Sequence, residues 1–229
     1  MNLPIYKRLL SEAFGTFWIV FAGTGAIIIG DVSGAIPHTG VAIVFGLAVF
    51  TMISALSDVS GAHFNPAVTI GFYLAGRCPR KNVLPYLLSQ FAGAIGASFV
   101  LHCLFPEHET LGATFPSGSF EQSWVLEMIL TFALMFVILS VSTGTRDKAM
   151  TAGLAIGGVV ALEALFAGPI SGASMNPARS LGPALISGQM QGIMLYFTAP
   201  IIGAVLAVLA CVCTREKGCC TSSVEKSCS

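Results

Sequence analysis

Six long stretches without a charged residue constrain this chain more than any other feature of its sequence. They cover residues 13–30, 32–57, 82–106, 128–145, 149–162 and 180–214. A helix needs about 20 apolar residues to cross a bilayer, and most of these stretches are long enough. The alternative, one large soluble domain, would have to bury them behind only 11 basic and 11 acidic residues in a chain of 229 that is 55% hydrophobic. We therefore predict an all-α membrane protein embedded in a lipid bilayer.

The chain has six predicted spans and, apart from them, two shorter apolar segments. The spans are expected near residues 9–30, 39–57, 84–105, 124–142, 150–167 and 193–213. The shorter segments, 65–75 and 176–186, are too short to cross a bilayer alone, and each opens with Asn-Pro-Ala. We predict that both are half-membrane helices.

The basic residues predict the orientation of these spans, because cytoplasmic loops collect Lys and Arg. The loops 31–38 and 106–123 contain neither residue, and Arg179 is the only basic residue on their side of the membrane. Both termini are therefore predicted to be cytoplasmic. The other ten basic residues all fall on the opposite side: Lys7, Arg8, Arg77, Arg80, Lys81, Arg146, Lys148, Arg215, Lys217 and Lys226.

The end of the chain is rich in cysteine. We expect residues 1–214 to form a single membrane domain and residues 215–229 to form a disordered cytoplasmic tail. The tail cysteines lack the paired CxxC pattern of a zinc site, so palmitoylation or a thiol site for a soft metalloid are the alternatives. No metal site, cofactor site or nucleic-acid-binding basic block is predicted. The cysteines concerned are Cys211, Cys213, Cys219, Cys220 and Cys228.

The two halves of the chain repeat each other. SGAHFNPAVTIG at 60–71 and SGASMNPARSLG at 171–182 share seven of twelve residues. Further similarities link Glu12 with Glu127, and GAIGA at 93–97 with GAVLA in the second half. The repeats, about 1–110 and 120–214, have three spans each, and an odd number forces them into opposite orientations. In such inverted repeats the interrupted helices meet at the membrane midplane and form the site.

The doubled motif predicts two helix starts facing each other. Asn is a favoured N-cap and Pro is favoured at the first helical position. Each helix N-terminus carries about half a positive charge, which opposes cations, while the Asn amides can donate hydrogen bonds to a passing oxygen. Such a centre favours neutral hydroxylated solutes. The motif residues are Asn65, Pro66, Ala67, Asn176, Pro177 and Ala178.

At these residues the chain resembles the major intrinsic proteins, the aquaporin and glycerol-facilitator family, over nearly its whole length. The resemblance implies an aquaporin-like fold of six transmembrane helices plus two re-entrant half-helices. It also implies a homotetramer with a pore in every subunit, which passes water and small neutral solutes without catalysis. A secondary transporter, which can share inverted repeats, would need coupling groups, but neither half-helix contains an acid or a histidine. An enzyme would need a nucleophile, a base and an orienting group, which do not occur together at recognisable spacing.

The resemblance also implies a selectivity filter of four residues: Phe45, Ala164, Ala173 and Arg179. Arg179 would repel cations and donate hydrogen bonds to solute oxygens. Strict water channels commonly have histidine where this chain has Ala164, so two alanines predict a wider and less polar constriction. The segment LFAGPISGASMNPARSLGPA resembles the nodulin-like branch and its bacterial relatives, which pass glycerol and undissociated metalloid acids such as arsenous acid. Ser180, where glycerol facilitators typically have aspartate, argues against glycerol, and a strict water channel is the alternative.

The remaining polar residues within the spans receive structural interpretations. Glu12 and Glu127 correspond to family glutamates that accept hydrogen bonds from the re-entrant loops, and a carboxylate inside a membrane needs such a partner. Glu163 is expected either to tune the pore or to hold the backbone. His63 is expected to line the cytoplasmic vestibule, and the other histidines show no metal-ligand spacing: His38, His102 and His108.

Overall fold

The computed structural model describes residues 3–142 and 146–214, and for residues 146–150 it describes the backbone alone. Within these residues all regular structure is helical, and six helices are long and apolar enough to cross a membrane. The two remaining helices are short. The long helices are α1 (Ile5–Ser33), α2 (His38–Ser60), α4 (Arg80–Leu104), α5 (Phe120–Val141), α6 (Arg146–Ser171) and α8 (Ile193–Thr214), and the short ones are α3 (Pro66–Leu74) and α7 (Pro177–Ser187). The predicted all-α membrane fold is therefore confirmed.

The long helices extend further than the charge-free stretches predicted. Charged residues mark where a helix leaves the hydrocarbon layer, but they do not end it. The helix α2 continues through Asp58 to Ser60, and α4 already begins at Arg80. Glycines in the left-handed conformation end the first two helices, with φ of 69° at Gly34 and 91° at Gly61. Capping, and not charge, thus sets these helix ends.

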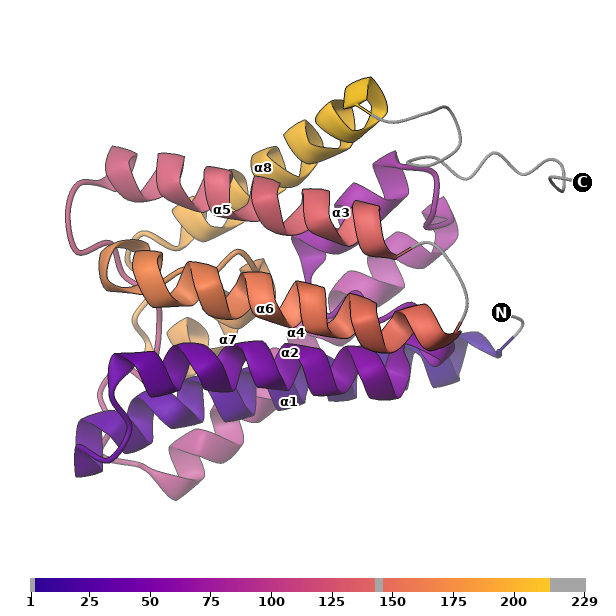
Figure 1. Ribbon diagram of the computed structural model, residues 1–229. Helices are drawn as coiled ribbons and strands as arrows, with labels where there is room; N and C mark the ends of the chain where they lie inside the picture. The colour runs from indigo at the N-terminus through magenta and orange to yellow at the C-terminus, as the bar shows by residue number, and fades with distance from the viewer. Residues whose placement is uncertain (1–2, 143–145, 215–229) are drawn as a thin grey trace, which may run out of the picture.

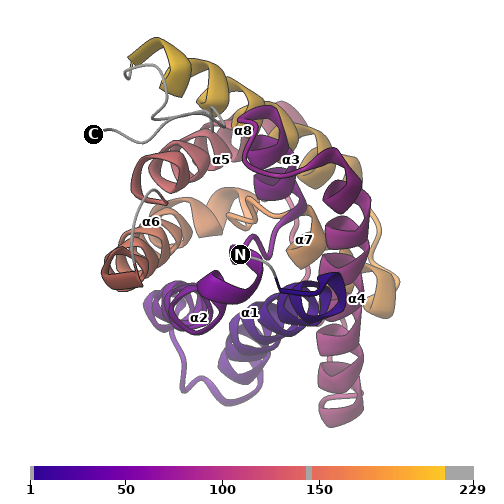
Figure 2. The same ribbon diagram turned by 90° about the vertical axis from the view of Figure 1, so that its right-hand side faces the viewer.

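The helices surround a centre that contains the two short helices. The view along the bundle in Figure 2 shows the six long helices around α7 and the irregular segments that lead into α3 and α7. The most extensive packing joins α2 to α6, α5 to α8 and α1 to α4, while α3 packs on α8 and α7 on α4. Each short helix therefore packs on a long helix of the other half. In Figure 1, α1 begins and α8 ends at the same end of the bundle.

Close backbone packing repeats in both halves. A Cβ atom at Gly93 of α4 would meet the backbone of Ala13 and Phe17 in α1. In the second half, a Cβ at Gly203 of α8 would meet the backbone of Met128 in α5. Ala13 and Met128 are 115 residues apart and the two glycines 110, the same offsets as in the sequence repeat. The glycines therefore let α1 approach α4, and α5 approach α8, backbone to backbone.

We expect Gly93→Ala and Gly203→Ala each to destabilise the protein by about 1–3 kcal/mol, because a methyl group must push two helices apart. Thermal unfolding in detergent measures the effect. Gly96→Ala on α4 is the matched control, since its nearest neighbour would be Phe17 at an ordinary 3.7 Å. Equal melting temperatures for all three variants would contradict the packing argument.

Candidate functional site

The short helices begin as their Asn-Pro sequences predict. Asn65 is extended, with φ of −154°, and its Oδ1 accepts a hydrogen bond from the Ala67 backbone N–H at 2.9 Å. Asn176 caps α7 in the same way and accepts from the N–H groups of Ala178 at 3.0 Å and Arg179 at 3.4 Å. Both amide oxygens are thereby occupied by their own helices, so both amide nitrogens point away from them.

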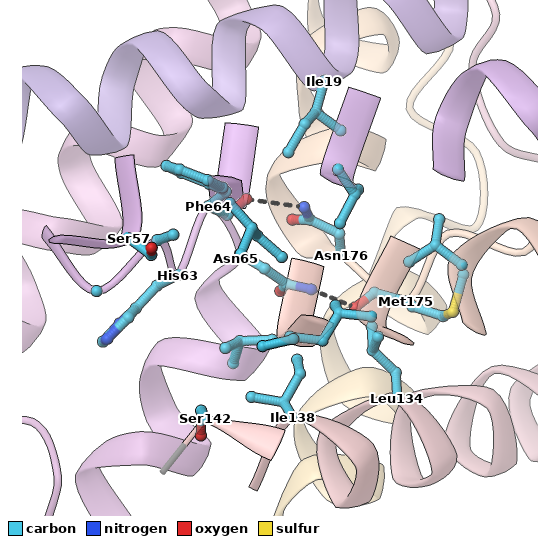
Figure 3. A pocket seen from close by; sticks show the side chains of 18 of the residues that line it. Ile19, Ser57, His63, Phe64, Asn65, Leu134, Ile138, Ser142, Met175 and Asn176 are labelled. Atoms are coloured by element: carbon cyan, nitrogen blue, oxygen red, sulfur yellow. Dashed lines mark hydrogen bonds between the residues drawn. The ribbon is translucent and has the colours of Figure 1, made fainter. Parts of the chain in front are cut away.

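The two amide nitrogens join the repeats at the centre of the molecule. Nδ2 of Asn65 donates to the carbonyl oxygen of Met175 at 2.8 Å, and Nδ2 of Asn176 donates to that of Phe64 at 3.0 Å (Figure 3). An amide nitrogen carries two hydrogens, so each asparagine keeps a second N–H. The sequence predicted that these amides donate to solute, and the structure uses one N–H of each to hold the opposite loop.

The segments before the two short helices have the same unusual backbone. In each, a glycine with positive φ is followed by non-glycine residues in the left-handed region, a conformation that costs roughly 1–2 kcal/mol per residue. Such a backbone persists only where its surroundings hold it. The φ values are 91° at Gly61, 52° at Ala62 and 51° at Phe64 in the first half, and 82° at Gly172, 41° at Ala173 and 55° at Met175 in the second.

A fully buried carboxylate holds the first of these loops. Oε1 of Glu12 accepts from the Ser60 hydroxyl at 2.6 Å and the His63 backbone N–H at 3.0 Å. Oε2 accepts from the Phe64 N–H at 2.7 Å and from Nε2 of Gln90 at 2.8 Å. Four donors therefore compensate the burial of this group, two of them from the strained segment.

The second half repeats this arrangement with one donor fewer. Oε1 of Glu127 accepts from the Ser171 hydroxyl and the Ser174 N–H, both at 2.8 Å. Oε2 accepts from the Met175 N–H at 2.8 Å. The position equivalent to Gln90, 110 residues later, is Pro200, which has no side-chain donor. The second carboxylate thus depends more heavily on its own loop.

A cavity of about 750 Å³ connects the candidate residues. It is lined by Asn65 and Asn176 at the centre and extends to Ser57, Asp58 and Ser142 at one end. The cavity also reaches all four residues of the predicted filter: Phe45, Ala164, Ala173 and Arg179. The structure therefore brings the asparagine of each motif and the four predicted filter positions to one cavity, which Pro66, Ala67, Pro177 and Ala178 do not line.

Two contacts fix Arg179, the arginine of the predicted filter. The Cζ atom of Arg179 lies over the ring of Phe45, 5.1 Å from its centroid, and Nη1 donates to the carbonyl oxygen of Gly112 at 2.9 Å. A guanidinium has five N–H donors, so this arrangement leaves donors for the cavity that Arg179 lines. The contact with Gly112 could not be predicted, because a backbone carbonyl leaves no residue-type signal.

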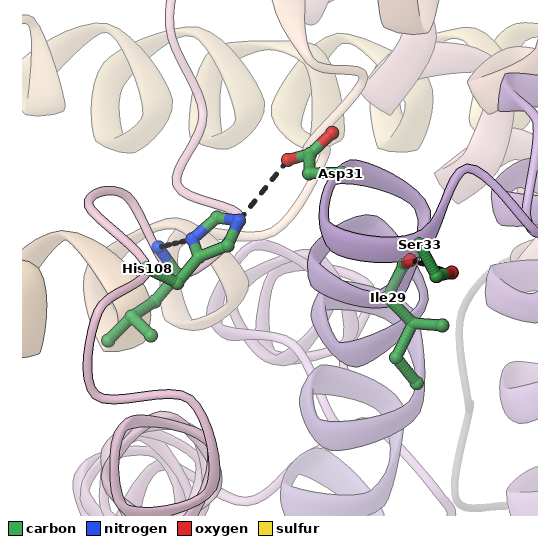
Figure 4. A network of polar contacts seen from close by, with 5 residues as sticks. Ile29, Asp31, Ser33 and His108 are labelled. Atoms are coloured by element: carbon green, nitrogen blue, oxygen red, sulfur yellow. Dashed lines mark hydrogen bonds and ion pairs between the residues drawn. The ribbon is translucent and has the colours of Figure 1, made fainter.

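The loop that supplies this carbonyl is tied to the end of α1. Nδ1 of His108 accepts from the Leu111 backbone N–H at 3.0 Å, so Nε2 is the protonated nitrogen and donates to Asp31 at 3.3 Å (Figure 4). Leu111 and Gly112 both have positive φ, at 51° and 72°. His108 thus supports the turn that presents the carbonyl of Gly112 to Arg179.

The other singled-out residues lie off the solute path, with one exception. Ser180 is fully buried and accepts from the Thr114 hydroxyl at 2.9 Å, so it supports the loop. Oε2 of Glu163 is buried and has no hydrogen-bond partner within the part of the chain that the structure describes. His63 is the exception, because it lines the cavity. No metal-binding group of His, Cys, Asp or Glu was found among the described residues, and the predicted tail 215–229 lies outside them.

Comparison with known proteins decides the family. The family model for the major intrinsic proteins matches residues 1–211. The chain belongs to this family. It is 48% identical to Aquaporin NIP1-1 of Zea mays over 212 residues, which are 92% of this chain and 75% of the maize protein. It is 42% identical to Nodulin-26 of Glycine max over 207 residues, 90% of this chain and 76% of the soybean protein.

A solved structure supports the same assignment. The aquaglyceroporin from Plasmodium falciparum superimposes with a TM-score of 0.81 at 25% identity, covering 89% of this chain and 94% of that one. This member of the major intrinsic protein family is therefore a multi-pass membrane channel with the aquaporin fold. The resemblance recognised from the doubled motif is confirmed.

The two loop carboxylates differ from Glu163 in a way that can be tested. Glu127→Gln should destabilise the protein by about 1–3 kcal/mol and lower its water permeability, because an amide NH₂ would face backbone N–H donors. Thermal unfolding and light scattering of reconstituted vesicles measure the two effects. Glu163→Gln is the isosteric control and should keep both properties, since its Oε2 accepts no hydrogen bond from a described residue. Equal losses in both variants would refute the anchoring role of Glu127.

Proposed function

We propose that this channel passively conducts water and small uncharged solutes, including glycerol and undissociated metalloid acids such as arsenous acid, and excludes protons and ions. The observation that carries the proposal is the composition of the filter. Ala164 and Ala173 both line the cavity, and neither offers a hydrogen bond from its side chain or fills the space of a larger residue. Phe45 and Arg179 alone supply bulk and polarity there.

Exclusion of cations follows from fixed positive charge along the cavity. The helices α3 and α7 present their N-termini to its centre, and each N-terminus carries about half a positive charge. Arg179 adds a full charge at the filter and is only 4% exposed, so water screens it poorly. A proton or metal ion would therefore meet repulsion at two successive points, whereas a neutral solute would not.

The cavity suits a solute with both carbon and hydroxyl groups. Aliphatic side chains such as Ile19, Leu134 and Val160 line it together with the polar side chains of Asn65 and Arg179. A polyol can place its carbons against the former and its hydroxyls against the latter. The name of the structurally similar Plasmodium falciparum protein, an aquaglyceroporin, agrees with a pore wide enough for such solutes.

We further propose that both termini are cytoplasmic, that the channel domain spans 1–214 and that it assembles as a homotetramer in the cell membrane. Support for the orientation comes from Arg77, Arg80 and Lys81, which lie in or beside the loop between α3 and α4. No cofactor, metal or catalytic step belongs to the proposal. The alternative function is a strict water channel. Ser180 stands where glycerol facilitators typically have aspartate, which makes the glycerol assignment weaker than that of a wide pore.

Reconstituted vesicles distinguish the two functions. The wild-type protein should raise permeability to water, glycerol and arsenous acid above that of empty vesicles. Ala164→His should reduce glycerol and arsenous acid flux by about tenfold or more, because it narrows a site at which a small change in fit has effects of this size. Water flux should change far less, and Ala164→Gly, which keeps the position small, should conduct all three.

Two outcomes would overturn the proposal. Water flux without glycerol or arsenous acid flux in the wild-type protein would establish the strict water channel. Uptake that saturates and depends on an ion gradient would indicate a transporter.

A further inference from the structure

We propose that Gly23 of α1, which does not border the cavity, determines how wide the filter is. Its absent side chain leaves the space in which the ring of Phe45 lies. This inference rests on the proposed role of Phe45 and Arg179 as the filter. It assigns the width of that filter to a residue behind it.

The ring of Phe45 occupies the volume that a side chain at position 23 would fill. The three atoms nearest to a Cβ placed on Gly23 are Cε1, Cδ1 and Cζ of Phe45, all closer than real Cβ atoms approach a carbon. Gly23 itself is buried within α1. The ring of Phe45 therefore packs directly on the backbone of α1 at Gly23, and α1 prevents it from moving further in that direction.

The ring of Phe45 also contacts Arg179. The guanidinium carbon of Arg179 lies over the ring, 5.1 Å from its centroid, and the carbonyl of Gly112 holds this guanidinium in turn. Phe45 and Arg179 both line the cavity. Because Gly23 is not among the residues that line this cavity, a ring displaced from Gly23 moves into the space that Phe45 and Arg179 share.

The helix that carries Phe45 cannot retreat to relieve such a displacement. The next residue, Gly46, packs against α6, where an added Cβ would lie 2.6 Å from both the carbonyl oxygen of Gly157 and the Cβ of Ala161. The helices α2 and α6 are thus already in backbone contact beside the filter. Since protein interiors are close-packed, a methyl group at position 23 acts on the ring and not on the position of α2.

The consequence is a change of selectivity without a change in any cavity-lining residue. Two of the four filter positions are alanine, so the width of the opening depends on how far the side chains of Phe45 and Arg179 extend into the cavity. Gly23→Ala should narrow this gap, so that glycerol flux falls by about tenfold or more while water flux falls much less.

Stopped-flow measurements on reconstituted vesicles test this inference with four variants. Gly23→Ala should lower the ratio of glycerol to water permeability, and Phe45→Leu should raise it. The double variant Gly23→Ala/Phe45→Leu should recover the wild-type ratio, since the smaller side chain makes room for the methyl group. Gly158→Ala is the matched control, because a methyl group added at Gly158 would have no neighbouring atom within 4 Å. It should leave the ratio of glycerol to water permeability unchanged.

Each failure has a distinct meaning. An unchanged ratio in Gly23→Ala, or a reduced ratio that Phe45→Leu does not restore, would overturn the inference. If Gly23→Ala does not fold, the double variant should still fold and conduct, because Phe45→Leu removes the predicted clash. A double variant that also fails to fold or conduct would overturn the inference. If the wild-type protein conducts water but no glycerol, the proposed function fails. The water permeability of the same four variants then still tests whether Gly23 controls the width of the filter.

Discussion

Two buried carboxylates, accepting hydrogen bonds from the loops in front of the short helices, are the interaction on which the rest of this structure depends. The loops adopt left-handed backbone at non-glycine residues, which is unfavourable by itself. Glu12 and Glu127 make it favourable, because an uncompensated carboxylate inside a membrane protein would be far more costly than the strain. Once the loops are held, Asn65 and Asn176 can cap their helices and reach each other's loops. The central geometry thus follows from charge compensation.

The two halves have the same backbone conformation in front of the short helices, but the polar side chains around these segments differ. Gln90 completes the donor set of Glu12, whereas Pro200 stands at the equivalent position near Glu127. In the second half, Ser180 in α7 instead accepts a hydrogen bond from Thr114 in the loop between α4 and α5. The half that carries the filter arginine therefore depends on the loop between α4 and α5, a segment outside the repeat.

The sequence predicted the repeated elements well and the contacts between them poorly, for physical reasons. Charge-free stretches and Asn-Pro starts depend on nearby residues, so six spans and two half-helices could be expected. The bond from Asn65 to the Met175 carbonyl joins residues 110 positions apart, and a backbone acceptor can belong to any residue type. The Gly112 carbonyl escaped prediction for the same reason. The true length of α2 was missed because its end depends on the left-handed glycine after it.

The proposed filter illustrates how residues behind a pore can help to determine its dimensions. Two of its four positions are alanine, so Phe45 and Arg179 must define the opening, and both are fixed from behind by glycine. Gly23 gives the ring room against α1, and Gly112 offers its carbonyl to the guanidinium. Helix α1 contacts the ring of Phe45, the ring contacts the guanidinium of Arg179, and this guanidinium contacts the loop at Gly112. On this proposal, two channels with the same four filter residues would differ in solute size limit wherever the residues behind the filter differ.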